Sequence, residues 1–93
     1  MKPELRVSEV RIRMADRAEK GLVAWASCVV NDCLFLNNIA IRRGGDGELV
    51  LTYPATRSRR DVKYFHFRPI NPEAKAALDR AILGALQDLA EVR

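Results

Sequence analysis

The sequence contains no apolar run that approaches the roughly 20 consecutive residues of a membrane-spanning helix. Its first ten residues, MKPELRVSEV, also lack the apolar segment of a secretory signal peptide. We therefore expect a cytoplasmic protein that has no membrane partner. The length of 93 residues is that of one domain, and we predict a single domain over residues 1–93.

Residues for catalytic and metal chemistry are scarce. The chain has two cysteines and one histidine, too few for a four-ligand zinc site, and the stretch RRGGDGE lacks the Lys-Ser/Thr of a phosphate-binding loop. Asp46 and Asp61 lie beside arginines and form no catalytic carboxylate pair. A Cys–His dyad with His66 is formally available, but no third group is evident to orient it. We predict no catalytic residue, metal, cofactor or small-molecule substrate, and thus no enzyme.

Cys28 and Cys33 lie on either side of Asn31-Asp32, a pair typical of a hairpin turn. A two-residue turn places Val30 opposite Cys33 and Cys28 opposite Phe35. The cysteines then lie diagonally on one sheet face, which is poor geometry for a disulfide. We expect two buried, reduced thiols that pack as small apolar residues.

Alternating apolar and polar residues predict strands through the first two thirds of the chain. The second segment is apolar at both parities, which predicts burial on both of its faces. Given its apolar neighbours, Trp25 is expected in the core or in an interface, and not as a base-stacking platform. Asn37-Asn38 interrupts the third segment and indicates a bend or bulge. Five strands are predicted, at Val7–Met14, Leu22–Val30, Cys33–Arg43, Glu48–Tyr53 and Asp61–Arg68.

A helix is predicted to follow Asn71. Asn71 is a favoured N-cap residue, Pro72 suits the first helical position, and Glu73 complements the helix dipole. Apolar residues then recur at helical spacing up to Leu89. The predicted fold class is α+β, with an antiparallel sheet of about five strands followed by one amphipathic C-terminal helix packed on it.

The chain is basic, with a net charge of +4 at pH 7 that is unevenly distributed. Residues 1–70 carry 13 Lys and Arg against 8 Asp and Glu, whereas residues 71–93 carry 3 against 4. A basic body indicates an anionic partner, most often nucleic acid.

Six basic residues form two clusters. Arg42 and Arg43 end the third predicted strand, and Arg57, Arg59, Arg60 and Lys63 lie on the hairpin that follows the fourth. Antiparallel pairing of neighbouring strands is expected to bring the two clusters together at one end of the sheet. Arginine suits phosphate oxygens, and Tyr53, Tyr64 or His66 are candidates to stack on a base. The alternative is that charged hairpin tips serve solubility and prevent edge pairing. The candidate nucleic-acid-binding residues are Arg57, Arg59, Arg60, Lys63, Arg42 and Arg43.

The order of motifs resembles the SpoVG family, small bacterial regulators named for stage V sporulation and septation. The resemblance rests on VSEVRIR, AWASCVVNDCLFLNNIAI, GELVLTYPATR and RPINPEAKAALDRAI, and it covers about residues 7–89. It implies a homodimer that binds DNA, and in some members RNA, without catalytic activity.

In that family a basic loop after the proline is implicated in nucleic-acid binding. The resemblance carries this role to Arg57, Arg59, Arg60 and Lys63. The family's Thr-Pro-Asp-Gly is replaced here by the more basic run Thr56 to Asp61, and its histidine is replaced by Arg68.

Dimerisation is also expected independently of the resemblance, because a short chain with a strand that is apolar on both faces needs more cover than one helix provides. The first functional hypothesis is a dimeric nucleic-acid-binding regulator. The rival hypothesis is a protein–protein adaptor of cell division or assembly whose basic loops bind an acidic partner.

Overall fold

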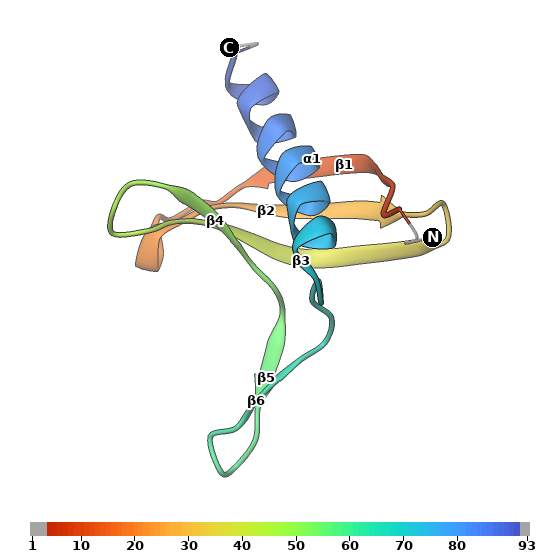
Figure 1. The fold of residues 1–93 in the computed structure, drawn as a ribbon. Coiled ribbons are helices and arrows are strands. Elements are labelled where there is room, and N and C mark those ends of the chain that lie inside the picture. The colour runs from red at the N-terminus through yellow and green to blue at the C-terminus, as the bar shows by residue number, and fades with distance from the viewer. Residues whose placement is uncertain (1–3, 92–93) are drawn as a thin grey trace.

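The computed structural model describes residues 4–91. Its main sheet is antiparallel, with strand order β1-β2-β3-β4 (Figure 1). The strands are β1 (Val7–Met14), β2 (Leu22–Val30), β3 (Leu34–Arg43) and β4 (Leu49–Thr52), with a 3-10 turn, η1 (Glu19–Gly21), before β2. A separate hairpin pairs β5 (Ala55–Arg57) with β6 (Lys63–Phe65), and α1 (Pro72–Glu91) follows. The predicted α+β class with one C-terminal helix is confirmed.

The predicted fifth strand is the main departure from the expected sheet. Residues 61–68 were expected to form one strand, but only Lys63–Phe65 is paired, and its partner is β5. Pro54 lies between β4 and β5 and has no N–H to donate to a ladder. The chain therefore leaves the main sheet after Thr52, and the hairpin projects away from it (Figure 1).

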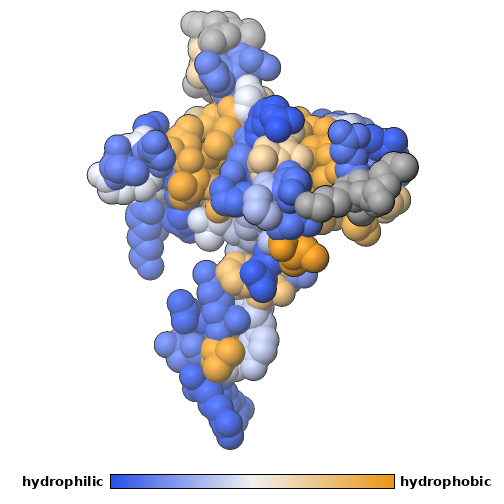
Figure 2. Space-filling model, in the orientation of Figure 1, coloured by the Kyte–Doolittle hydropathy of each residue, from blue (hydrophilic) through white to orange (hydrophobic). Residues whose placement is uncertain are grey.

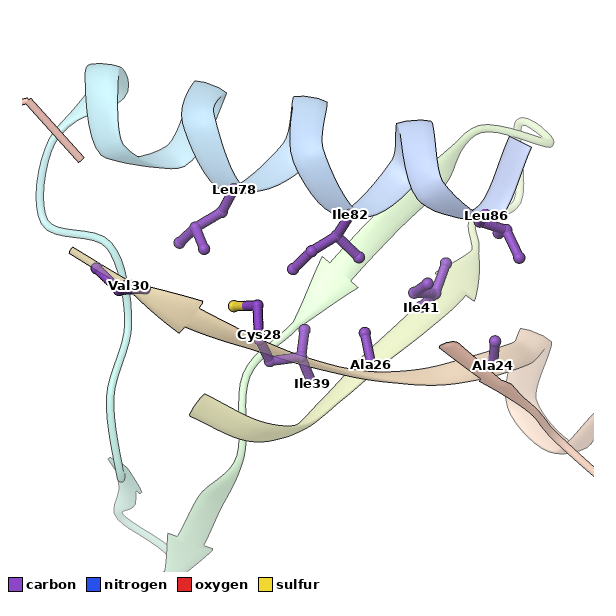
Figure 3. Packing of buried hydrophobic residues seen from close by; sticks show 9 residues of the cluster. All are labelled: Ala24, Ala26, Cys28, Val30, Ile39, Ile41, Leu78, Ile82 and Leu86. Carbon is purple, nitrogen blue, oxygen red and sulfur yellow. The ribbon is translucent and has the colours of Figure 1, made fainter. Parts of the chain in front are cut away.

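The core lies between α1 and one face of the main sheet. Leu78, Ile82 and Leu86 are buried and point from the helix toward the sheet (Figure 3). They meet small residues of β2 and the larger Ile39 and Ile41 of β3. The small side chains let the helix approach closely while the isoleucines fill the remaining volume. Asn71 caps the helix as predicted, because its Oδ1 accepts a hydrogen bond from the Ala74 N–H at 2.7 Å.

The turn between β2 and β3 differs from the prediction by one residue. Asn31 and Asp32 adopt positive φ, and the Cys33 N–H donates to the Val30 carbonyl at 3.1 Å, as in a two-residue turn. Strand pairing resumes at Leu34, however, which lies opposite Val30. This shift makes the expectation for Cys33 wrong.

Cys33 is exposed, whereas Cys28 is fully buried under the helix, and neither forms a disulfide. Burial raises the pKa of the Cys28 thiol, which keeps it protonated. The bulge expected at Asn37-Asn38 is confirmed by the shift in β2–β3 register and by the positive φ of Asn38.

The other face of the main sheet carries apolar residues without being covered by the helix. Trp25 and Val29 are partly exposed, and Phe35 and Val50 are exposed. The predicted burial of β2 on both faces is therefore wrong for the chain by itself. The reason is that α1 has one apolar stripe, which covers one face of the sheet. The segment that contains β5 and β6 forms the projecting hairpin and does not cover the other face.

Gly21 offers a sharp test of the packing between η1 and β3. Its φ is +79°, and a Cβ added there would lie 2.5 Å from the Arg43 carbonyl oxygen. We expect Gly21→Ala to lower the free energy of unfolding by about 1–3 kcal/mol. The added Cβ would force the backbone of η1 or of Arg43 to move, and alanine rarely adopts the positive φ of this position. Urea unfolding of this variant should be compared with that of Gly45→Ala, where the added Cβ meets nothing within 4 Å. Equal midpoints for the two variants would contradict the prediction.

Candidate nucleic-acid interface

The predicted basic loop is the tip of the hairpin formed by β5 and β6, which we call the basic hairpin (residues 55–65). Arg57 pairs with Lys63 at the end of the ladder, and residues 59–61 close the loop. The Ser58 N–H donates to the Val62 carbonyl at 2.9 Å, and the Asp61 N–H donates to the Ser58 carbonyl at 2.9 Å. Asp61 has a φ of 61°, the left-handed conformation that such three-residue loops require.

Ser58 holds the loop together from within. Its Oγ accepts hydrogen bonds from the backbone N–H groups of Arg60 at 3.3 Å and Val62 at 3.2 Å. Short polar side chains stabilise turns in this way because they satisfy backbone donors that have no ladder partner. The basic loop is therefore a turn held by its own side-chain and backbone hydrogen bonds.

The cations of the hairpin are not equivalent. Arg57 Nη1 lies 3.0 Å from Asp61 Oδ1, and both side chains are well exposed. The carboxylate partly neutralises Arg57. Arg59 and Arg60 lie at the tip, are exposed, and make no ion pair with another residue in the range 4–91. These two guanidinium groups are the freest to contact an anion.

One aromatic residue of the hairpin, Phe65, lies beside two cations. Lys63 Nζ is 4.8 Å from the centroid of the Phe65 ring, and Arg68 Cζ is 5.6 Å from it, both within the range of cation–π attraction. Sequence reasoning missed Arg68, because the predicted strand placed it on the face opposite Phe65. The local sequence pattern does not show that strand pairing ends at Phe65, so it does not predict that Arg68 lies over the Phe65 ring.

The three candidates for base stacking differ in how accessible they are. Tyr64 is 59% exposed on the hairpin. The His66 ring nitrogen Nε2 lies 2.7 Å from Thr56 Oγ1. The backbone N–H of His66 donates to the Pro54 carbonyl at 2.8 Å, so both the ring and the backbone of this residue are held at the base of the hairpin. Tyr53 is packed against the core. Tyr64 is therefore the most available of the three.

Tyr53 is packed against the core and is not available at the surface as a stacking platform. Its ring meets Phe67 edge to face at a centroid distance of 5.9 Å, and its buried hydroxyl makes no hydrogen bond to another described residue. Burial, with a smaller contribution from the negative charge of Asp79, raises the pKa of Tyr53 above its ordinary value.

This burial predicts a pH effect on stability. Because the raised pKa belongs to the folded state, the Tyr53 contribution is complete below the ordinary tyrosine pKa of about 10 and is lost as pH rises above it. We expect Tyr53→Phe to unfold at equal or higher urea concentration at neutral pH, and to lose less stability than the wild type above about pH 10. Parallel alkaline losses in both proteins would contradict this assignment.

Arg42 and Arg43 do not join the hairpin cluster. They pair with Val50 and Leu49 at the start of β4, whereas the basic hairpin begins only beyond the end of that strand. Arg42 Nη1 donates to the Lys20 carbonyl at 3.3 Å, and Arg43 Nη1 donates to the Gly47 carbonyl at 3.0 Å. The expectation that the two clusters meet at one end of the sheet is therefore wrong, and the reason is that the predicted fifth strand lies outside the sheet.

The arrangement offers little for catalysis or metal binding in the described range. Cys28 lies under the helix and His66 is bound at the hairpin, so the formal Cys–His dyad is not assembled. Among the side chains that the structure describes, residues 4–90, no group of three or more His, Cys, Asp or Glu is suited to a metal ion. Within the same range, no helix has the length and apolar character to cross a membrane.

Comparison with known proteins agrees with the ordered motifs of the sequence. A family model described as SpoVG matches residues 5–88, which span the sheet, the basic hairpin and most of α1. A protein of Borrelia hermsii (strain HS1 / DAH), named "Putative septation protein SpoVG", is 31% identical over 80 residues. The match covers 84% of this chain and 82% of that protein. The chain belongs to the SpoVG family.

Proposed function

We propose that this protein is a regulator that binds DNA, and RNA as a second target, by gripping phosphate groups with the basic hairpin. The observation that carries the proposal is the exposure of Arg59 and Arg60 at the tip of a projecting turn, with no ion-pair partner among the described residues. Residues 57–63 carry four cations against one carboxylate. A convex, cationic tip is suited to contact a polyanion's backbone.

The shape of the hairpin favours phosphate contacts over extensive base reading. The hairpin is mainly hydrophilic and stands clear of the body (Figure 2). The apolar stripe of α1 faces the core, so this helix is poorly placed to serve as a recognition helix. Phosphate contacts supply affinity and salt dependence but little sequence selectivity. Arg42, Arg43 and Lys63 are proposed as supporting contacts along a longer polyanion.

We propose further that the protein acts as a homodimer. A groove of about 870 Å³ lies between the start of α1 and the β2–β3 turn, and Leu34 and Ile70, which line it, are 58% and 84% exposed. A second copy that covers these side chains would bury apolar surface and place two basic hairpins on one particle. Two linked hairpins bind a long polyanion more tightly than one. Analytical ultracentrifugation is expected to give the mass of two chains, and a monomer at all concentrations would contradict this part.

The proposed biological role is regulation of gene expression or septation in the cytoplasm, without catalysis. Support comes from the family, which is regulatory, and from the name of the Borrelia hermsii relative, which describes a septation protein. The sparse catalytic chemistry of the sequence agrees with a binding role.

Salt dependence tests the function directly. Fluorescence anisotropy with labelled DNA and RNA oligonucleotides should show binding that weakens steeply with salt. If three arginines each neutralise one phosphate of a duplex, affinity falls about 40-fold between 50 and 200 mM salt. The rival adaptor function predicts weak binding of generic nucleic acid. Binding that is absent or insensitive to salt would therefore reject the proposed function.

A further inference from the structure

The sheet surface opposite α1, which we call the open face, carries a second group of exposed cations and aromatic rings. Strand register places Arg13, Trp25 and Ala40 side by side in one row across β1, β2 and β3. Arg11 lies opposite Ser27 in the next row. Alternation along each strand directs these residues away from the core-facing Ala24, Ala26 and Cys28 (Figure 3).

Two aromatic residues occupy separate places on this face. Trp25 is partly exposed near the middle of β2, and Phe35 is 64% exposed opposite Val29. Val29, which lies opposite Phe35, is four positions beyond Trp25 in β2, and this offset corresponds to about 13 Å along the strand. Exposed rings with this spacing form two separate platforms on one surface.

The charge of the open face has one sign over most of its area. Strands β2, β3 and β4 contain no aspartate or glutamate, and the one acidic residue of β1, Glu9, lies at its bulge. Arg11 and Arg13 are exposed and make no ion pair with another residue in the described range. Both guanidinium groups are thus available to an anionic partner.

A shallow depression brings the polar and aromatic groups together. It has a volume of about 110 Å³ and is lined by residues that include Arg11, Arg13, Trp25, Ser27 and Asn37. Asn37 Oδ1 accepts a hydrogen bond from the Asn38 N–H at 2.8 Å, while its amide NH₂ makes no hydrogen bond to another residue between 4 and 91. The depression therefore combines cations for phosphate, a ring for stacking and an amide donor.

These features favour a single-stranded polyanion over other occupants. A second copy docked face to face would bury the guanidinium groups of Arg11 and Arg13 against a surface on which β2, β3 and β4 supply no carboxylate. An acidic protein would satisfy the arginines but would make no specific use of the spaced rings. Duplex bases are stacked within the helix, whereas unpaired bases present their faces to aromatic side chains.

We propose that the open face is a second nucleic-acid site, selective for single strands, in which Phe35 and Trp25 stack on bases while Arg11 and Arg13 contact phosphates. The inference rests on the proposed function for the class of partner, but it uses a surface that the basic hairpin does not share.

Two exposed apolar residues on opposite faces of the main sheet provide the variants for the test. Phe35 lies on the open face, whereas Met14 is 40% exposed and lies opposite Ala24 on the helix side of the sheet. We expect Phe35→Ala to weaken binding of a labelled oligo-dT strand about fivefold or more, since one stacking contact is lost. Met14→Ala should leave that affinity unchanged, Phe35→Tyr should restore it, and none of the three should alter duplex binding.

Trp25 supplies an independent readout because it is the single tryptophan of the chain. Saturating oligo-dT is expected to quench its fluorescence and to protect it from acrylamide. The Arg57/Arg59/Arg60→Ala variant should need more oligonucleotide but reach the same final quenching, because the open face is intact.

Several outcomes would overturn the inference. Unchanged Trp25 emission at saturation, or equal losses for Phe35→Ala and Met14→Ala, would leave the hairpin function standing and reject the open-face site. Shielding of Trp25 that grows with protein concentration and ignores oligonucleotide would assign the face to a second copy instead. Absence of all oligonucleotide binding by the wild type would reject the proposed function together with this site.

Discussion

Replacing Arg57, Arg59 and Arg60 together by alanine is expected to weaken duplex binding at least tenfold at low salt and to flatten its salt dependence. Each phosphate contact contributes about 0.9 to the slope of log affinity against log salt, so three lost contacts reduce the slope by about 2.7. Arg59 and Arg60 should account for most of the effect, because Asp61 lies 3.0 Å from Arg57 and partly neutralises it. Anisotropy titrations over a salt series measure both quantities.

The control for this experiment must remove the same charge elsewhere. Arg6/Arg17/Arg80→Ala makes an equal change in net charge at exposed positions outside the basic hairpin. We expect it to retain most of the affinity and of the salt slope. If both triple variants lose affinity equally, binding reflects overall charge and the hairpin has no special role.

Asp61→Asn should move affinity in the opposite direction. The change releases Arg57 from its ion pair, and asparagine tolerates the positive φ that Asp61 adopts. A tighter complex with an unchanged urea midpoint is expected. A weaker complex would show that the carboxylate orients Arg57 for binding instead of competing with the phosphate.

Ile82→Ala is expected to lower the free energy of unfolding by about 2–5 kcal/mol. Ile82 is fully buried at the centre of the α1–sheet contact, between Leu78 and Leu86 (Figure 3). Domains of this size are stable by only about 5–14 kcal/mol, so the variant loses a large share of the total. Urea unfolding followed by far-UV circular dichroism measures the change.

The matched control lies on the same helix. Leu89 is 37% exposed, and Leu89→Ala removes apolar atoms that are only partly buried while keeping a good helix former. We expect its loss to stay well below that of Ile82→Ala. Similar losses at both positions would indicate that helix propensity, and not packing against the sheet, controls stability.

The local features of this protein were predictable from its sequence. Alternation and an apolar run bounded by turn residues predicted β1 to β4, the helical period after Asn71 predicted α1 with its cap, and Asn37-Asn38 predicted the bulge in β3. These elements depend on side-chain periodicity, capping and turn preferences over a few neighbouring residues, which the sequence contains directly. The order of motifs also identified the family, because it samples nearly the whole chain at once.

What the tertiary structure decided concerns how separate segments meet. The basic loop was predicted, but its position depends on β5 and β6 pairing with each other outside the sheet, so Arg42 and Arg43 remain apart from it. The exposure of Cys33 follows from a one-residue shift in register, which the turn sequence did not specify. Strand pairing is a choice among distant partners of similar local propensity, and it is settled by which arrangement buries the shared core. The sequence thus determined the elements and the family, whereas packing determined which side chains face α1 and which remain on the open face.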